Sequence, residues 1–420
     1  MADKKIKVLV ISDHPLSPSG VGTQTKYMIE SCLRTNKFSF TCIGGAIKHQ
    51  NYTPVKIEPY GDDFIIIPVD GYGDHDMIRS LIRTHKPDIL WFMTDPRFFG
   101  WLWEIENEIR ANVPMVYYHV WDNTPYPKYN KVWYDSTDWI FTISKVTDDI
   151  VKTVSPDVKR MYFPHAVNSD IFSPLEKEDI NSFIENNIPQ IKDKFVFFWN
   201  NRNARRKQSG SLIFWFNDFL KKVGKDKACL IMHTNPQDTH GQDLQAIIKN
   251  LGLDNGEVIF STEAVQAELL AKLYNAADCT VNISDAEGFG LATLESLSCG
   301  TPIIVNMTGG LQEQVTDGEN WFGIGIEPSS KAIIGSQSVP YIYEDRINGD
   351  DLVNAMLEMY NMTPEEREEL GKAGRSHVEA NYNFAQLQAK WPVLLEEIHN
   401  ELGSWETRKG YNSWELIKVA

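Results

Sequence analysis

The most informative segment of the chain is Asp285–Pro302, which reads DAEGFGLATLESLSCGTP. Leucines recur every three residues over Leu291–Leu297 and predict a helix that begins near Gly290. Gly300 is suited to the position just past the end of this helix, and Pro302 cannot continue it. The segment therefore predicts a turn, a short helix and a second turn.

The first of these turns has the features of a phosphate-binding loop. Gly288 and Gly290 carry no side chain, so the backbone can approach a ligand closely. The free amides at the start of the helix can hold a phosphate. Glu287 precedes the helix and Glu295 lies about one turn inside it. Hydrogen-bond acceptors on both sides of a phosphate site suit a nucleotide-sugar, which has a ribose on one side and a hexose on the other.

Short β-branched and aromatic runs alternate with helical patterns along the chain, and this alternation predicts parallel sheets covered by helices. In the first half the runs are Lys7–Ile11, Phe40–Ile43, Phe64–Ile67, Ile89–Phe92, Val116–His119 and Trp139–Ile143. In the second half they are Phe195–Trp199, Cys229–His233, Val258–Phe260, Cys279–Ile283 and Ile303–Val305. Helical patterns between them include Met77–His85 and Phe98–Arg110.

A weaker pattern with scattered prolines, from Asn168 to Lys194, separates the two halves. We therefore predict an α/β chain with two Rossmann-like, doubly wound domains, residues 1–190 and 191–390, and a helical tail, residues 391–420. Two such sheets facing each other would form a cleft, with ligands bound outside the carboxyl ends of the strands.

Composition excludes several classes of protein. The 420 residues include 41 Lys and Arg against 57 Asp and Glu, a net charge of −16, which is unfavourable for a general nucleic-acid binder. No stretch of 18 apolar residues predicts a membrane span, although peripheral membrane contact stays open. The five cysteines include no C-x-x-C pair, which favours reduced thiols and a cytoplasmic location.

The segment around Glu287 and Glu295 resembles the E-x7-E signature of retaining glycosyltransferases with the GT-B architecture, specifically family 4. Further matches follow the order of that family over nearly the whole chain. They are Ser19–Gly22, His119, Phe163–Asn168, Asn201–Lys207, Gly309–Glu313 and Asp317–Asn320.

The resemblance implies a GT-B fold in which residues 1–190 bind the acceptor, residues 191–390 bind the nucleotide-sugar donor, and the C-terminal helix crosses back onto the first domain. It implies no cofactor and no metal. Arg202 and Lys207 would neutralise the donor diphosphate, because fixed cations stabilise the charge that develops on the leaving group. His119 would bind the transferred sugar, and Glu287 would contact its hydroxyls.

Those four residues form the implied catalytic set. The implied donor-binding residues are Gly20, Gly22, Arg202, Lys207, Glu287, Gly288, Phe289, Gly290, Leu291 and Glu295. Contacts to the base are expected near His233, Ser261 and Thr262.

The implied function is transfer of a hexose, with retention of configuration, from a nucleotide-sugar to a hydroxyl of a glycan or another molecule. GDP-mannose is favoured over a UDP-sugar because mannosyl transfer is common in the family. The chain departs from the family at His165, Ala166 and Asn168, and the segment Gly323–Asp345 is interpreted as an insert.

Other functions stay open. A GT-B epimerase or phosphorylase, or a non-catalytic nucleotide-sugar-binding protein, would share the fold. A dinucleotide-binding oxidoreductase is disfavoured because Thr25 stands where the third glycine of G-x-G-x-x-G is needed. The pair Asp74 and Asp76 has the D-x-D spacing of metal-dependent enzymes, but Asp is also common as a helix cap.

Overall fold

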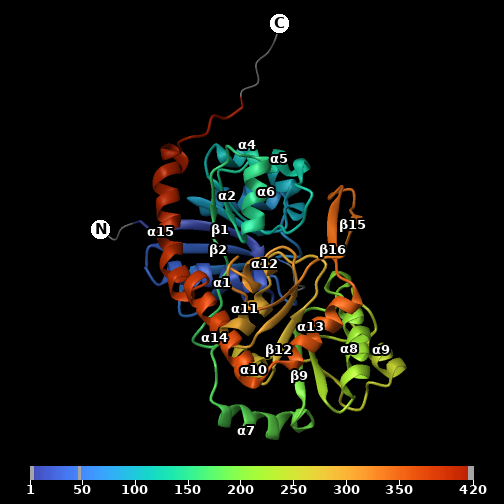
Figure 1. Ribbon diagram of the computed structural model, residues 1–420. Coiled ribbons are helices and arrows are strands. Elements are labelled where there is room, and N and C mark those ends of the chain that lie inside the picture. The colour runs from blue at the N-terminus through green and yellow to red at the C-terminus, as the bar shows by residue number, and fades with distance from the viewer. Residues whose placement is uncertain (1–3, 46–48, 415–420) are drawn as a thin grey trace.

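The computed structural model describes residues 4–45 and 49–414. Residues 1–3 and 46–48 of the predicted N-terminal domain and residues 415–420 of the predicted tail lie outside this description. Figure 1 shows two α/β domains, one above the other, with the C-terminal helices running along one side of both.

The N-terminal half forms an eight-stranded sheet in the order β3-β4-β2-β1-β5-β6-β7-β8. Its strands run parallel except β3, which is antiparallel to β4. The strands are β1 (Ile6–Asp13), β2 (Phe38–Gly45), β3 (Val55–Ile57), β4 (Gly61–Pro68), β5 (Ile89–Thr94), β6 (Met115–His119), β7 (Trp139–Thr142) and β8 (Arg160–Tyr162).

Helices and short 3-10 turns connect these strands: α1 (Gly20–Leu33), α2 (His75–His85), η1 (Pro96–Phe98), α3 (Gly100–Trp103), α4 (Glu106–Arg110), η2 (Lys128–Asn130), α5 (Lys131–Asp135) and α6 (Lys145–Val154). Asp74 caps α2 by accepting a hydrogen bond from the Met77 amide, so this aspartate has the capping role that the sequence suggested. The single helix expected over Phe98–Arg110 is instead divided between α3 and α4.

The C-terminal half forms a second, fully parallel sheet in the order β11-β10-β9-β12-β13-β14. Its strands are β9 (Phe195–Asn200), β10 (Ala228–His233), β11 (Val258–Ser261), β12 (Cys279–Asn282), β13 (Ile303–Asn306) and β14 (Gly323–Ile326). Its helices and turns are η4 (Arg205–Lys207), α8 (Ser209–Val223), α9 (Leu244–Leu251), α10 (Ala267–Asn275), α11 (Leu291–Ser298), α12 (Leu311–Val315) and α13 (Gly349–Asn361).

The link between the sheets contains α7 (Lys177–Asn187) and η3 (Pro189–Ile191). The predicted boundary at residue 190 falls within this link. All eleven apolar runs overlap observed strands, which confirms the two parallel sheets of the sequence prediction. Within the two large sheets, the strands that the sequence did not reveal are β3, β8 and β14, each of only three or four residues.

The interpretation of Gly323–Asp345 as one insert is wrong for its first part. Gly323–Ile326 is β14, which pairs with β13 and completes the second sheet. A Cβ at Gly323 would lie 2.1 Å from the Ile303 carbonyl oxygen, so the close strand approach requires glycine. The remainder forms a separate hairpin of β15 (Ser330–Ile334) and β16 (Ile342–Arg346).

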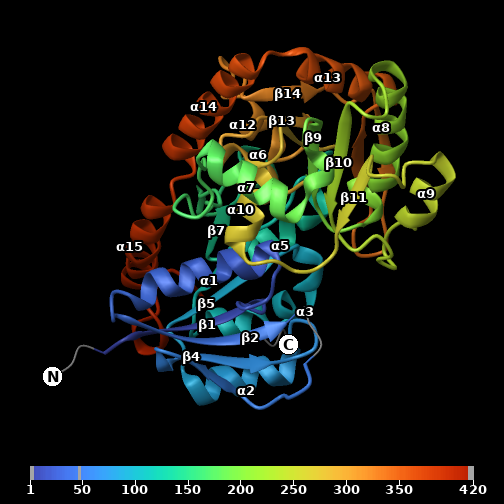
Figure 2. The same cartoon turned by 90° about the horizontal axis from the view of Figure 1, so that it is seen from below.

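The C-terminal helices cross from the second domain back to the first. Helix α14 (Pro364–Asn381) packs on α11, and α15 (Phe384–Leu402) packs on α1 (Figures 1 and 2). Beyond α15, at the short turn η5 (Trp405–Thr407), the chain stays on the N-terminal domain, where Ser404 donates to Asp88 at 2.7 Å. No helix in the described parts of the chain is long and apolar enough to cross a membrane.

Trp391 on α15 fixes this crossing. Its side chain is 1% exposed, and its ring lies 4.6 Å from Phe163 and 5.2 Å from Phe141, measured between centroids. Both phenylalanines belong to the N-terminal domain, so the tryptophan joins the tail to that domain's core.

We expect Trp391→Ala to lower the free energy of unfolding by about 3–5 kcal/mol, because it leaves a large cavity among aromatic rings. Val393 on the same helix is 52% exposed, and Val393→Ala is the matched control, with an expected change within about 0.5 kcal/mol. Chemical denaturation followed by tryptophan fluorescence and circular dichroism measures both. Equal stability of the two variants would show that α15 does not depend on this contact.

Candidate active site

A cavity of about 560 Å³ lies between the carboxyl ends of the two sheets. Both domains contribute to its walls, as expected for ligand sites in open α/β sheets. From the N-terminal domain it is lined by Ser19, Gly20, Val21, Thr94, Asp95, Arg97, Phe98, Val120, Trp121, Asp122, Asn123, Ile143 and His165. From the second half it is lined by Asn200, Asn201, Arg205, Arg206, Asn282, Ala286–Ala292, Ile334, Val339, Ile342 and Glu344.

The start of α11 forms one wall of this cavity. Gly290 has φ of 93°, a left-handed conformation that glycine adopts without strain, and a Cβ there would lie 2.5 Å from Leu311. The first hydrogen bond within the helix runs from the Leu294 amide to the Gly290 carbonyl, and no side chain caps the helix. The amides ahead of Leu294 therefore have no partner inside the helix and can bind an anion.

Two cations lie beside this helix start, on the turn η4 after β9. Lys207 is buried and donates from Nζ to the Glu287 carboxylate. Burial lowers the pKa of Lys207 to about 8, so it is mostly charged at neutral pH. Burial raises the pKa of Glu287, but Lys207 and Arg206 outweigh this effect and hold that pKa below its usual value.

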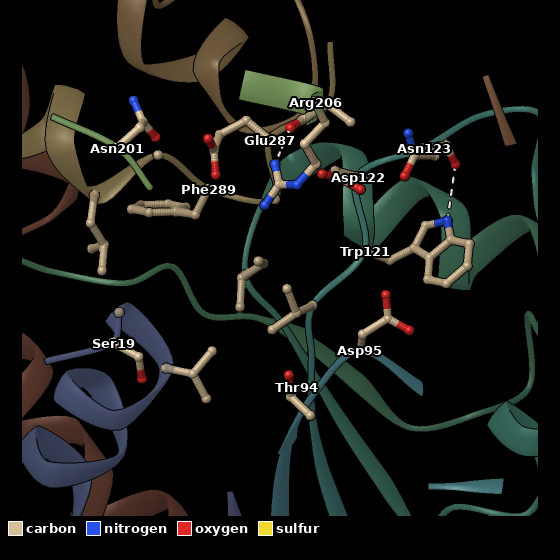
Figure 3. Close-up of a pocket in the computed structure, with 18 of the residues that line it drawn as sticks. Ser19, Thr94, Asp95, Trp121, Asp122, Asn123, Asn201, Arg206, Glu287 and Phe289 are labelled. Carbon is tan, nitrogen blue, oxygen red and sulfur yellow. Dashed lines mark hydrogen bonds between the residues drawn. The ribbon is translucent and has the colours of Figure 1, made fainter. Parts of the chain in front are cut away.

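Arg206 donates to the Ala286 carbonyl and lines the cavity, where Figure 3 shows its guanidinium between Glu287 and Asp122. Asp122 also lines the cavity, and burial raises its pKa to about 6 although the charge of Arg206 opposes the shift. The centre of the site thus combines two cations with two acidic side chains.

A second cavity of about 260 Å³ continues from the first and shares Gly20, Asn200, Leu291 and Ala292 with it. Glu295 lines this second cavity and accepts a hydrogen bond from the Tyr274 hydroxyl at 2.7 Å. Burial raises the pKa of Glu295 to about 7. The two glutamates of the signature therefore serve two adjoining compartments, one on each side of the helix start.

The structure brings most of the predicted donor-binding residues to these cavities. Gly20, Glu287, Gly288, Phe289, Gly290 and Leu291 line the larger one, and Glu295 and His233 line the smaller one. Lys207 lines neither cavity but is bonded to Glu287, which lines the larger one. Ser261 bonds His233 at 2.9 Å without lining either cavity, and Thr262 is exposed on the surface.

Arg202 differs from the expectation. Its side chain is 62% exposed and forms an ion pair with Asp238, with Nε 2.6 Å from the carboxylate. It is absent from the lining of both cavities, whereas Arg205 and Arg206 line the larger one. The side chains of Arg206 and Lys207, on the turn η4, instead contact the loop before α11, where Arg206 donates to the Ala286 carbonyl and Lys207 donates to Glu287.

His119 also differs from the expectation. It is fully buried at the end of β6, where its ring nitrogens bond the hydroxyls of Tyr117 at 3.0 Å and Tyr134 at 2.7 Å. Burial lowers its pKa to about 3, so the ring is neutral. Both ring nitrogens are occupied inside the domain, which leaves none to contact a sugar in the cavity.

Gly22 lies within the first turn of α1 and not in a loop. A Cβ there would lie 2.4 Å from the Ser17 hydroxyl and 2.6 Å from the His14 carbonyl, so this glycine serves the packing of its own helix. Gly20 instead faces Leu291 of the other domain, which a Cβ would approach to 2.8 Å.

Sequence reasoning missed Asp95, Asp122 and Arg206, whereas Trp121 was one of several aromatic residues considered for stacking on a sugar ring. Asp95 directly follows the carboxyl end of β5, and Asp122 lies three residues after the end of β6. That position in a parallel sheet is the signal that could have found them. Arg206 had no such signal, because three arginines stand within five residues and no local pattern separates Arg205 and Arg206, which line the cavity, from Arg202, which does not.

Comparison with known proteins agrees with this architecture. Residues 182–377 match the model of the family described as "Glycosyl transferases group 1". Sucrose-phosphate synthase from Thermosynechococcus elongatus superimposes with a TM-score of 0.73 at 18% identity, over 94% of this chain and all of that one. HepE of Anabaena, solved in complex with UDP and glucose, superimposes with a TM-score of 0.68 at 16% identity, over 93% of this chain and all of that one.

Similarities in sequence to curated proteins are local. The D-inositol 3-phosphate glycosyltransferase of Acidothermus cellulolyticus is 32% identical over 143 residues, 31% of this chain and 32% of the relative. The GDP-mannose-dependent monoacylated alpha-(1-6)-phosphatidylinositol monomannoside mannosyltransferase of Corynebacterium glutamicum is 29% identical over 120 residues, 29% of this chain and 24% of the relative. The chain thus spans about a third or less of these relatives' length.

These findings confirm the resemblance and the fold class that the sequence suggested. The fold is the two-domain GT-B architecture. The segment 182–377 is similar to the group 1 glycosyl transferases.

The raised pKa of Glu295 predicts a pH dependence of stability. Because the folded protein holds this proton more tightly than the unfolded chain, Glu295 contributes stability that is present below about pH 4.5 and is lost as the pH rises through about 7.

We therefore expect Glu295→Gln, which keeps the shape without the charge, to be more stable than the natural protein at pH 8 by about 1–3 kcal/mol. The advantage should shrink toward pH 5. Thermal unfolding at pH 5, 6, 7 and 8 measures the difference. A difference that does not change with pH would mean that Glu295 is charged in the folded protein throughout.

Proposed function

We propose that this protein is a retaining glycosyltransferase that moves a hexose from a nucleotide-sugar to a hydroxyl acceptor, without a metal. The observation that carries the proposal is the start of α11, where free backbone amides, Arg206 and the pair Lys207–Glu287 meet at one wall of the cavity between the domains. Such a site suits a diphosphate with a sugar on one side.

In the proposed complex the diphosphate lies against the amides of Gly290 and Leu291. The nucleoside extends into the smaller cavity, toward Glu295 and His233, and the hexose lies on the side of Glu287. Arg206 and Lys207 balance the charge of the phosphates. Because that charge grows as the glycosidic bond breaks, fixed cations stabilise the transition state more than the bound donor.

The bond between the hexose C1 and the phosphate oxygen breaks in this reaction, and a bond between C1 and the acceptor oxygen forms on the same face. The acceptor proton passes to a phosphate oxygen of the leaving group. Glu287 orients the sugar hydroxyls and does not attack C1, because its carboxylate is held by Lys207.

The donor is proposed to be GDP-mannose, with a UDP-sugar as the alternative. The similarity to a GDP-mannose-dependent mannosyltransferase favours the first, whereas HepE binds UDP and glucose on the same fold. His233 and Glu295 in the smaller cavity do not by themselves discriminate between guanine and uracil.

The proposal is tested by offering GDP-mannose, UDP-glucose and related donors and measuring the release of nucleoside diphosphate in the presence of chelator. We expect release from one donor class, and we expect Glu287→Ala and Glu287→Gln to slow it by about 10–150-fold, the value of one charged hydrogen bond. Release at the natural rate by both variants would remove Glu287 from the site. Loss of activity on chelation would overturn the metal-independent mechanism.

The two arginines at positions 202 and 206 offer a matched pair. Arg206→Ala should weaken the binding of GDP or UDP by about 10–150-fold, because it removes a charged hydrogen-bond donor from the cavity. Arg202→Ala, which changes an exposed ion pair, should leave the affinity within about twofold. Isothermal titration calorimetry measures both. Weaker binding in Arg202→Ala alone would restore the role that the sequence had suggested for that residue.

A further inference from the structure

The hairpin of β15 and β16 belongs to neither large sheet. Figure 1 shows it rising from the C-terminal domain alongside the N-terminal domain. Its base is fixed to the C-terminal domain, because the Asp345 amide donates to the Asp285 carbonyl at 2.8 Å and the buried Glu344 accepts from Arg205 at 2.8 Å.

The same hairpin is also bonded to the N-terminal domain. The Tyr343 amide donates to the Thr124 carbonyl at 2.6 Å, and the Asn123 side chain donates to the Tyr343 carbonyl at 2.8 Å. Tyr129 donates its hydroxyl proton to the Tyr341 carbonyl at 2.8 Å, and the two rings meet edge to face. The hairpin therefore connects the domains directly across one side of the cavity.

Val339, in the loop between the two strands, packs into the apolar core cluster of the N-terminal domain and is 5% exposed. Moving the hairpin away from that domain would expose this apolar side chain to water. The connection is thus apolar as well as hydrogen-bonded.

The inner side of the hairpin forms part of the cavity wall. Ile334, Val339 and Ile342 present aliphatic surface there. Within the same cavity the N-terminal domain contributes the ring of Phe98 and the carboxylate of Asp95. Figure 3 shows Asp95 and Trp121 across the cavity from Glu287.

This combination of aliphatic and aromatic faces with a carboxylate matches a polyhydroxylated ring. The C–H faces of such a ring are apolar, and its hydroxyls donate hydrogen bonds to acids. Burial raises the pKa of Asp95, although Arg97, paired with it at 2.8 Å, opposes the shift.

We propose that the hairpin β15–β16 is the outer wall of the acceptor subsite and that this subsite takes a single polyhydroxylated ring, such as a free hexose or a cyclitol. The hairpin closes the cavity on its side by bonding both domains, so an extended glycan has no path out there. This inference rests on the proposed transfer reaction and adds to it the class of acceptor and the element that selects it.

The hairpin provides its own control. Ile334 lines the cavity, whereas its neighbour Ile333 points outward and is 68% exposed. We compare Ile334→Ala with Ile333→Ala, using glucose, galactose, mannose and myo-inositol as single-ring acceptors and maltotetraose as an extended one. The rate of nucleoside diphosphate release is measured with and without each acceptor.

In the natural protein we expect at least one single-ring acceptor to accelerate release and maltotetraose to do so at least tenfold less well. Ile334→Ala should raise the KM for the single-ring acceptor by about 5–30-fold, the effect of losing one apolar side-chain contact. The KM for the donor should change less than the KM for the acceptor, because Ile334 lies on the hairpin wall. Ile333→Ala should change each value by less than about twofold.

The outcomes separate the two proposals. No binding and no turnover of any nucleotide-sugar would overturn the transfer reaction itself, and the acceptor subsite with it. Donor turnover that no single ring accelerates, or that maltotetraose accelerates equally well, would overturn the acceptor class. Equal effects of Ile334→Ala and Ile333→Ala would overturn the role of the hairpin.

Discussion

The buried ion pair of Lys207 and Glu287 is the constraint on which the candidate site depends. Removing either charge from water costs several kcal/mol unless a partner compensates it, so each side chain requires the other. Their pairing fixes the turn after β9 against the loop before α11. That arrangement leaves Arg206 and the first amides of α11 facing the cavity, where they can donate hydrogen bonds to an anion such as a diphosphate.

Contacts on two sides hold the domains around this cavity. On the side of the C-terminal helices, Glu313 of α12 accepts from the Lys145 amide at 2.6 Å and from the Tyr162 hydroxyl at 2.7 Å, both in the N-terminal domain. On another side the hairpin β15–β16 bonds Asn123 and Thr124. Closure of the domains on a ligand would have to preserve or exchange these contacts.

The parts of this account that the sequence predicted are local. Glu287, Gly288 and Gly290 lie on one strand–turn–helix unit, whose geometry follows from short-range patterns of glycine and leucine. The parallel strands were visible because their apolar runs are buried on both faces. For the same reason the sequence could not show which way His119 points, since a fully buried strand has no polar face to set its orientation.

Other features depended on contacts that no local pattern encodes. The orientation of the arginines depends on tertiary contacts, because Arg206 donates to the Ala286 carbonyl whereas Arg202 pairs with Asp238. Strand β14 was hidden because its glycines are poor strand formers, and the close approach to β13 requires one of them, Gly323. The hairpin's position over the cavity depends on its contacts with a domain about 200 residues away in the chain.

The most direct measurement of the central claim is a crystal structure with GDP or UDP bound. The account predicts the diphosphate within hydrogen-bonding distance of the amides of Gly290 and Leu291 and of the Arg206 guanidinium, with the nucleoside toward Glu295. A diphosphate bound at Arg202 and Asp238, or anywhere outside the cavity between the sheets, would contradict it.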